Sequence, residues 1–343
     1  MKILKYKGIL FQKYMRIKNN MKKILSFLLG ILFVTGIAVQ ASDLIIESKN
    51  QSYKEEDSKI KFNGDVKVTI DELKVVGDSA DVNIINGQKL DTATFYDKPY
   101  AFEIKKNKKR EVKANILKVS LITKIIRAEG DTQSVVFDGK TPIVVINADT
   151  QEYNTKTGVM KANGTVSMLY KDLETFSNSA EITTDKNGDL KRLVLIGNAR
   201  VKQENNETIA DKFVYDASTG NIVASGHTTS TVFTDDGTKM VLKSGYQEYN
   251  QHRSVFNASN NVRIWYEDYY AAGPKVTLYP GPNGKPNEAN FIGRSSISQG
   301  VRTIYADRIK MTMKPKTFDA QGNTRTVIKN IGSNTDDNVT LGL

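Results

Sequence analysis

The chain has 343 residues, no cysteine and a formal net charge of +11. The lack of cysteine excludes disulfide crosslinks, thiolate zinc sites and cysteine nucleophiles. Residues 1–41 hold eight basic residues and no acidic one, so subtracting them from +11 leaves +3 for the remainder, which is not the clustered positive charge of a nucleic-acid-binding domain.

Residues 1–41 are predicted to be a signal peptide. Their basic stretch precedes ILSFLLGILFVTGIAV, which carries no charge, and the small residues Val39 and Ala41 stand where signal peptidase reads its site. Met21 begins a compact signal peptide by itself, so residues 1–20 are interpreted as an extension from an upstream start codon. The alternative is an uncleaved membrane anchor, although a membrane span usually needs ~20 apolar residues.

Two segments that follow share one pattern. KIKFNGDVKVTI (59–70) and GVMKANGTVSMLY (158–170) alternate between apolar and polar residues, and each has a glycine in the same place, Gly64 or Gly164. A period of two with one apolar face predicts a half-buried β-strand.

The same neighbourhood recurs at positions 64, 97, 130, 164, 197, 226, 260 and 293, at steps of 33, 33, 34, 33, 29, 34 and 33 residues. Glycine occupies six of these positions, and Asp97 and Asn260 occupy the others. A glycine repeated inside a strand predicts a bend, a bulge or space on the inner face. Polar turns and further short strands fit between the positions, so we expect a repeat of about 33 residues with three strands.

Three other segments are interpreted from composition. The basic run KKNKKR (105–110) lies between apolar strands and predicts a solvated loop, with contact to an anionic lipid headgroup as the alternative. YPGPNGKP (279–286) predicts a long loop. Residues 329–343 are polar and predict a frayed tail, so we expect the folded domain to span residues 42–328.

Several phrases resemble the OstA (organic solvent tolerance) and LptA family of periplasmic lipopolysaccharide-transport proteins. They are INADTQEYNTKTGVMKANGTVSM, IADKFVYDASTGNIVASG and the stretch from Asp91 to Val135. The resemblance covers most of residues 44–315, in patches. It implies an all-β fold, namely an elongated open β-jellyroll of two facing antiparallel sheets.

The resemblance also implies a function. Such a protein carries lipopolysaccharide across the periplasm with the acyl chains between its sheets, and it pairs edge strands with itself, with an inner-membrane LptC-like protein and with an outer-membrane LptD-like protein. It implies no catalytic residue, metal site or cofactor.

The residues expected to line the lipid groove are those at the apolar, alternate positions of the repeated strands. They are Ile60, Phe62, Val66, Val68, Phe95, Ile126, Ala128, Met160, Ala162, Val166, Met168, Leu193, Leu195, Ile222, Ala224, Phe256, Ala258, Val262 and Phe291. The same face also carries small and polar residues near Gly130 and Gly226, which favours a loosely filled interior.

Three alternatives remain open. An LptC-like, membrane-anchored component of the same pathway would share this fold. A secreted structural or adhesive β-solenoid would have a tightly filled core. An enzyme is disfavoured, because the acidic residues lie mainly in turns or on the polar parity and the two histidines, His227 and His252, have no partner at metal-ligand spacing.

Overall fold

The structure is a computed structural model that describes residues 44–85, 89–105, 108–170, 172–185, 188–234 and 237–329. The predicted signal peptide and residues 330–343 of the predicted tail lie outside the described residues. Among the residues that the structure describes, no helix has the length and apolar character needed to cross a membrane.

The predicted all-β fold is confirmed, and the described part of the chain forms 22 strands and one short 3₁₀ helix. The strands are β1 (Leu44–Glu47), β2 (Asn50–Lys54), β3 (Lys59–Ile70), β4 (Leu73–Ile85), β5 (Lys89–Tyr96), β6 (Tyr100–Lys105), β7 (Lys108–Lys113), β8 (Ile116–Ser120), β9 (Ile125–Asp138), β10 (Thr141–Asn154), β11 (Val159–Tyr170), β12 (Leu173–Thr184), β13 (Leu190–Gln203), β14 (Asn206–Asp216), β15 (Asn221–Phe233), β16 (Lys239–Asn250), β17 (Val255–Tyr266), β18 (Tyr269–Pro280), β19 (Pro286–Gln299), β20 (Arg302–Thr312), β21 (Thr317–Gln321) and β22 (Arg325–Ile328). The 3₁₀ helix is η1 (Glu55–Asp57).

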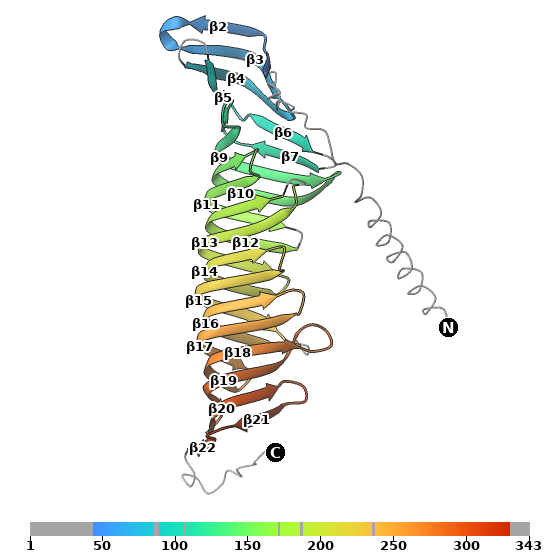
Figure 1. The fold of residues 1–343 in the computed structure, drawn as a ribbon, viewed down its shortest axis with the longest axis vertical. Coiled ribbons are helices and arrows are strands. Elements are labelled where there is room, and N and C mark those ends of the chain that lie inside the picture. The colour runs from blue at the N-terminus through green and yellow to red at the C-terminus, as the bar shows by residue number, and fades with distance from the viewer. Residues whose placement is uncertain are drawn as a thin grey trace, which may run out of the picture. The chain divides into compact units, whose positions relative to one another are not determined.

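Every strand pair is antiparallel, and from β9 to β20 each strand pairs with the next one along the chain. Figure 1 shows the result as an elongated stack of strands with short turns on its sides. All strands belong to one continuous hydrogen-bonded sheet.

The long strands bend sharply near their middle, at the repeated glycine positions. At Gly64 and Asp65 the pairing of β3 with β4 skips from Asn63 to Val66, and φ is +79° and +50°. At Gly164 and Thr165 the values are +75° and +44°. Two successive residues in the left-handed region turn the strand and leave the alternation of side chains unchanged, so the predicted bend is confirmed. We call these bends the corners.

The corner requires glycine for a second reason. A Cβ on Gly164 would lie 2.0 Å from Oδ2 of Asp149 on the neighbouring strand. The equivalent distance is 2.2 Å between Gly226 and Asp211. Glycine at these two corners therefore leaves room for an aspartate side chain of the adjacent strand, in addition to allowing the positive φ.

The corners divide the sheet into two walls that face each other. The Phe62 wall contains the segments on the Phe62 side of each corner, and the Val66 wall contains those on the Val66 side. Four of the bent strands are interrupted at the corner, and they appear as β1 with β2, β5 with β6, β7 with β8, and β21 with β22. The two facing sheets implied by the family resemblance are thus two walls of one folded sheet. We call the gap between their free edges the mouth.

The expected three-strand repeat is wrong. The interval from Gly164 to Gly197 contains the second half of β11, all of β12 and the first half of β13. One repeat therefore equals the length of two bent strands. The segments taken for separate short strands, such as Thr175 to Asp185, are arms of these longer strands. The alternation of apolar and polar residues continues through a corner. It therefore does not show whether the segments before and after the corner are one bent strand or two separate strands.

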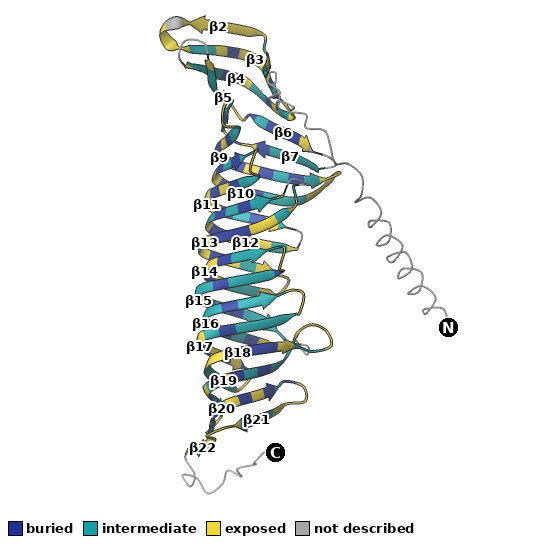
Figure 2. Ribbon diagram, in the orientation of Figure 1, coloured by how far each residue is buried: buried dark blue, intermediate teal, exposed yellow. Residues whose placement is uncertain are grey.

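Burial alternates along each strand, as expected for a sheet with one covered face. Figure 2 shows dark and light positions following each other along β10 to β20. The buried face points into the space between the walls, where apolar residues form two core clusters, one from Phe62 to Ala224 and one from Met240 to Met313.

Candidate functional site: the interior between the two walls

The predicted groove residues lie in four rows that run from strand to strand along the interior. The row next to the corners on the Phe62 wall follows the pairings Phe62–Ala80–Phe95–Leu117–Ala128 and continues to Phe291. It contains eight predicted residues, namely Phe62, Phe95, Ala128, Ala162, Leu195, Ala224, Ala258 and Phe291.

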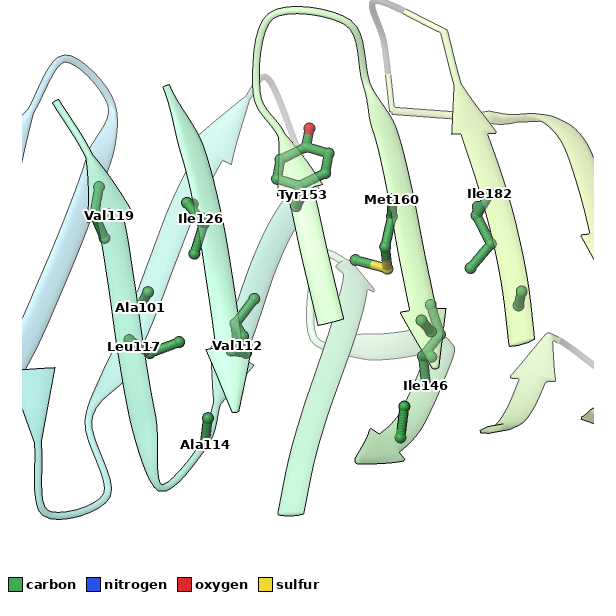
Figure 3. Packing of buried hydrophobic residues seen from close by; sticks show 14 of the residues in the cluster. Ala101, Val112, Ala114, Leu117, Val119, Ile126, Ile146, Tyr153, Met160 and Ile182 are labelled. Carbon is green, nitrogen blue, oxygen red and sulfur yellow. The ribbon is translucent and has the colours of Figure 1, made fainter. Parts of the chain in front are cut away.

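The second row of the Phe62 wall lies closer to the mouth. Figure 3 shows Val119, Ile126, Tyr153, Met160 and Ile182 side by side on successive strands of this row. It contains six predicted residues, namely Ile60, Ile126, Met160, Leu193, Ile222 and Phe256.

The other two rows lie on the Val66 wall. Val66, Val166 and Val262 follow the corners directly, and Val68 and Met168 lie two residues further along. The structure therefore brings all the predicted lining residues to the interior face of the folded sheet.

Burial differs between these rows only in part, because Ile126, Met160 and Leu193 of the mouth row are 4–5 % exposed, like the corner row. The eight residues of the corner row are 0–5 % exposed, because the opposite wall covers them. Ile60, Ile222 and Phe256, all in the row nearer the mouth, are half-buried. The corner row thus forms the packed core, and the accessible apolar surface lies toward the mouth.

The polar residues near Gly130, which the sequence suggested as loose filling, are instead satisfied by a buried glutamine. Gln151 is 4 % exposed. Its Nε2 donates to Oγ1 of Thr132 at 2.9 Å and to the carbonyl oxygen of Ile146 at 3.2 Å. Ser134 Oγ donates to Gln151 Oε1 at 2.5 Å. This group is a closed polar cluster inside an apolar interior.

An equivalent cluster lies near Gly226, around Gln247, which is 2 % exposed. Ser230 donates to Gln247 Oε1 at 2.5 Å, and its Oγ lies 2.8 Å from Oγ1 of Thr208. The sequences QEYN at 151–154 and at 247–250 mark both glutamines. That repeated phrase is the sequence feature from which the polar clusters could have been predicted.

A buried ion pair lies in the interior at β6, β7 and β10. Nη1 of Arg110 donates to Oε1 of Glu103 at 3.0 Å, and both side chains are at most 10 % exposed. The guanidinium carbon of Arg110 lies 4.3 Å from the ring centre of Tyr153, on the opposite wall. The predicted solvated basic loop is therefore only partly right, because Arg110, its last residue, points inward.

Three ion pairs join the walls across the mouth. Lys108 of β7 pairs with Asp189, in the connection between β12 and β13. Lys124 Nζ lies 3.1 Å from Oδ2 of Asp71. Lys316 pairs with Glu267 near the other end of the sheet. Each lysine and its partner come from different walls, so within the described part of the chain these three pairs bridge the mouth.

The interior contains several cavities. One of about 270 Å³ lies at the mouth beside Arg110, Glu103 and Lys108 and has a mixed polar lining. A cavity of about 230 Å³ lies between β12 and β19, and one of about 190 Å³ adjoins it. The last two are lined mainly by apolar side chains of both walls.

The described residues contain no group of three or more side chains arranged to hold a metal ion. His227 lies at a corner with a side chain that is 93 % exposed, and its Nδ1 is 2.9 Å from Oδ2 of Asp211. What the interior offers is apolar surface, two closed polar clusters and one ion pair, an arrangement suited to holding an apolar molecule.

Comparison with known proteins gives a partial match. No protein-family model matches the chain. No curated protein sequence matches it either. One similar solved structure is the crystal structure of LptH, the LptA-homologous periplasmic component of the lipopolysaccharide transport device of Pseudomonas aeruginosa, with 10 % identity and a TM-score of 0.34. The aligned part covers 38 % of this chain and 95 % of that one.

Proposed function

We propose that this chain binds the hydrocarbon part of an amphipathic lipid between its two walls and acts in lipopolysaccharide transport in the periplasm. The observation that carries the proposal is the apolar, partly accessible row near the mouth, which includes Ile60, Ile222 and Phe256. The sequence phrases that resemble the LptA and OstA family, and the predicted signal peptide, support the pathway and the compartment.

Holding a lipid in this way needs no bond chemistry. Each methylene that leaves water contributes roughly 0.8 kcal/mol, and a polar headgroup can stay at the mouth. The mouth row offers a similar apolar lining on successive strands, interrupted where Arg110 reaches the ring of Tyr153 from the opposite wall. Net direction must then come from partner proteins.

The ends of the sheet supply surfaces for such partners. Within the described residues, β1 and β2 each pair only with β3, and β21 and β22 each pair only with β20. An unpaired strand edge can accept a strand of another protein. We propose that these edges join further copies of this chain and the membrane-bound components of the pathway.

A photo-crosslinking experiment tests the lipid site. A crosslinking residue is placed at Ile60, Met160 or Phe256 on the interior face and, as matched controls, at Lys61, Lys161 or Asn257 on the outer face of the same strands. Labelled lipopolysaccharide should react with the first set. Reaction only with the outer set, or with neither set, would contradict the proposal.

Edge pairing is tested separately. Sedimentation of the purified chain should show end-to-end oligomers whose size increases with concentration. A proline at Ser52 in β2 should reduce them, because proline removes a strand hydrogen-bond donor. A species that stays monomeric at high concentration would count against this part of the proposal.

A further inference from the structure

The interior is interrupted between the two core clusters. The first cluster ends at Ala224, and the second begins at Met240. The cavity of about 230 Å³ lies at this boundary and is bordered by residues of both clusters. From the first come Val201, Phe213, Ile222 and Ala224, and from the second come Val232, Leu242, Phe256 and Leu278. The walls are therefore not in full contact at this point.

The adjoining cavity of about 190 Å³ extends this space toward β12. The two cavities share Leu173, Val201, Gln203, Phe213 and Ile222. We call the combined space the central cavity. Its lining residues come from nine successive strands, β11 to β19.

Polar groups border the central cavity at both of its sides. On the corner side, Ser230 and Gln247 line the cavity, and they already bond to each other at 2.5 Å. On the mouth side lies the loop from Pro280 to Pro286, in which Gly281 N donates to the carbonyl oxygen of Lys285 at 2.7 Å. Ser230, Gln247 and the Gly281 amide have partners of their own, whereas Thr175 Oγ1, at the β12 end of the cavity, has none among the described residues. The remaining lining is mainly apolar, which favours a molecule whose buried part has no hydrogen-bonding groups.

We propose that the central cavity is a binding site for a single unbranched hydrocarbon chain, with its polar end at the mouth beside Lys285. This inference rests on the proposed function and makes it more specific, because it replaces a uniform groove by one preferred position. The two component cavities, of about 230 and about 190 Å³, together fall at the lower end of the ~300–1,000 Å³ that is typical of ligand pockets. Their size suits one chain and not the several chains of a larger lipid.

Binding of dansyl undecanoic acid, a fluorescent single-chain fatty acid, to the full chain tests the site. We expect saturable binding of one probe per chain and displacement by lauric acid or by a lysophospholipid with the same chain. If only lauric acid displaces the probe, the site prefers a free fatty acid. If both compounds displace it, the site recognises the hydrocarbon chain that they have in common. Failure of both to displace the probe overturns the proposal.

Two variants locate the probe. Val232→Trp fills the central cavity, and Thr231→Trp introduces the same side chain on the outer face of the same strand. Excluding two or more methylenes should weaken binding at least ~tenfold in the first variant and leave it unchanged in the second. Equal binding losses in both, or no loss in Val232→Trp, would overturn the proposal. Leu173→Trp, which fills the part shared by both cavities, replaces Val232→Trp if that variant does not fold.

The result is separable from that of the lipopolysaccharide experiment. Crosslinking at Ile60 and Met160 does not involve the central cavity. If lipopolysaccharide reacts there while the probe does not bind, the proposed function stands and the single-chain site is wrong. If neither lipid binds, both fail.

Discussion

Lys108 and Asp189 form an ion pair although 81 residues separate them in the chain, and the pair joins the two walls across the mouth. Asp189 is 63 % exposed, so water screens its charge strongly. A contact of this kind closes an opening without contributing much to stability. We expect the mouth to open more readily when the pair is removed, while the fold stays intact.

A double-mutant cycle with Lys108→Ala and Asp189→Ala should therefore give a coupling free energy of only about 0.2–1 kcal/mol, smaller in high salt. Amide hydrogen exchange in residues 188–190 should accelerate in either variant. The control is the pair Lys202–Glu174, 3.9 Å apart and within one wall, whose removal should leave that exchange unchanged. Unchanged exchange in the Lys108 and Asp189 variants would contradict the bridging role.

The buried pair of Glu103 and Arg110 should behave differently. Arg110→Met leaves the carboxylate of Glu103 buried without its guanidinium, so we expect a loss of about 3–5 kcal/mol in the free energy of unfolding, measured in urea. The double variant Glu103→Gln with Arg110→Met should recover much of this loss. Arg127→Ala, which removes an exposed pair with Glu152, should cost less than about 1 kcal/mol. A small effect of Arg110→Met would show that the pair is hydrated.

Gly164→Ala tests the origin of the corners. Its φ of +75° and the 2.0 Å approach to Asp149 both oppose a side chain. Gly237→Ala is the matched control, because its φ is +83° and nothing lies within 4 Å. Backbone strain alone costs about 1–2 kcal/mol, so Gly164→Ala should lose clearly more unfolding free energy than Gly237→Ala. Equal losses would mean that φ, and not the neighbouring strand, selects glycine.

Gln151→Leu should destabilise the fold, although leucine is apolar and similar in size. The change removes the partner of the Ser134 hydroxyl, and an orphaned buried group costs about 1–3 kcal/mol. Adding Ser134→Ala should restore part of the loss in thermal unfolding. If the single variant is as stable as the parent, the cluster is not needed for stability.

Stability should also fall in acid through Glu111. Burial, the largest single influence, raises the pKa of this carboxyl, but hydrogen bonds from Lys109 and Tyr100 and the charges of Lys109 and Lys113 outweigh it and hold the pKa below its ordinary value. A lowered folded-state pKa stabilises the protein above the unfolded-state pKa, and this contribution is lost as the pH falls through the folded-state value. Urea unfolding at neutral and acidic pH should show a smaller acid loss for Glu111→Gln than for the parent.

The sequence predicts most of this fold, because the alternation of apolar and polar residues corresponds to the alternation of interior and exterior side chains along each strand. Gly64 and Gly164 locate the corners, and Met160 and Phe256 lie on the interior face as their parity requires. Alternation cannot show that Met160 lies in the mouth row and Ala162 in the packed corner row, because both have the same parity. It also cannot show that Arg110 and Gln151 point inward, since their burial depends on partners from distant strands.

The regular corners have a consequence for the reach of the protein. Each corner returns after two strands, so a whole two-strand unit could be added or removed while every other strand keeps its partner. At ~4.8 Å between neighbouring strands, one such unit changes the separation of the two terminal edges by about 10 Å. The number of repeated corner positions in the sequence therefore sets the distance between the two terminal edges.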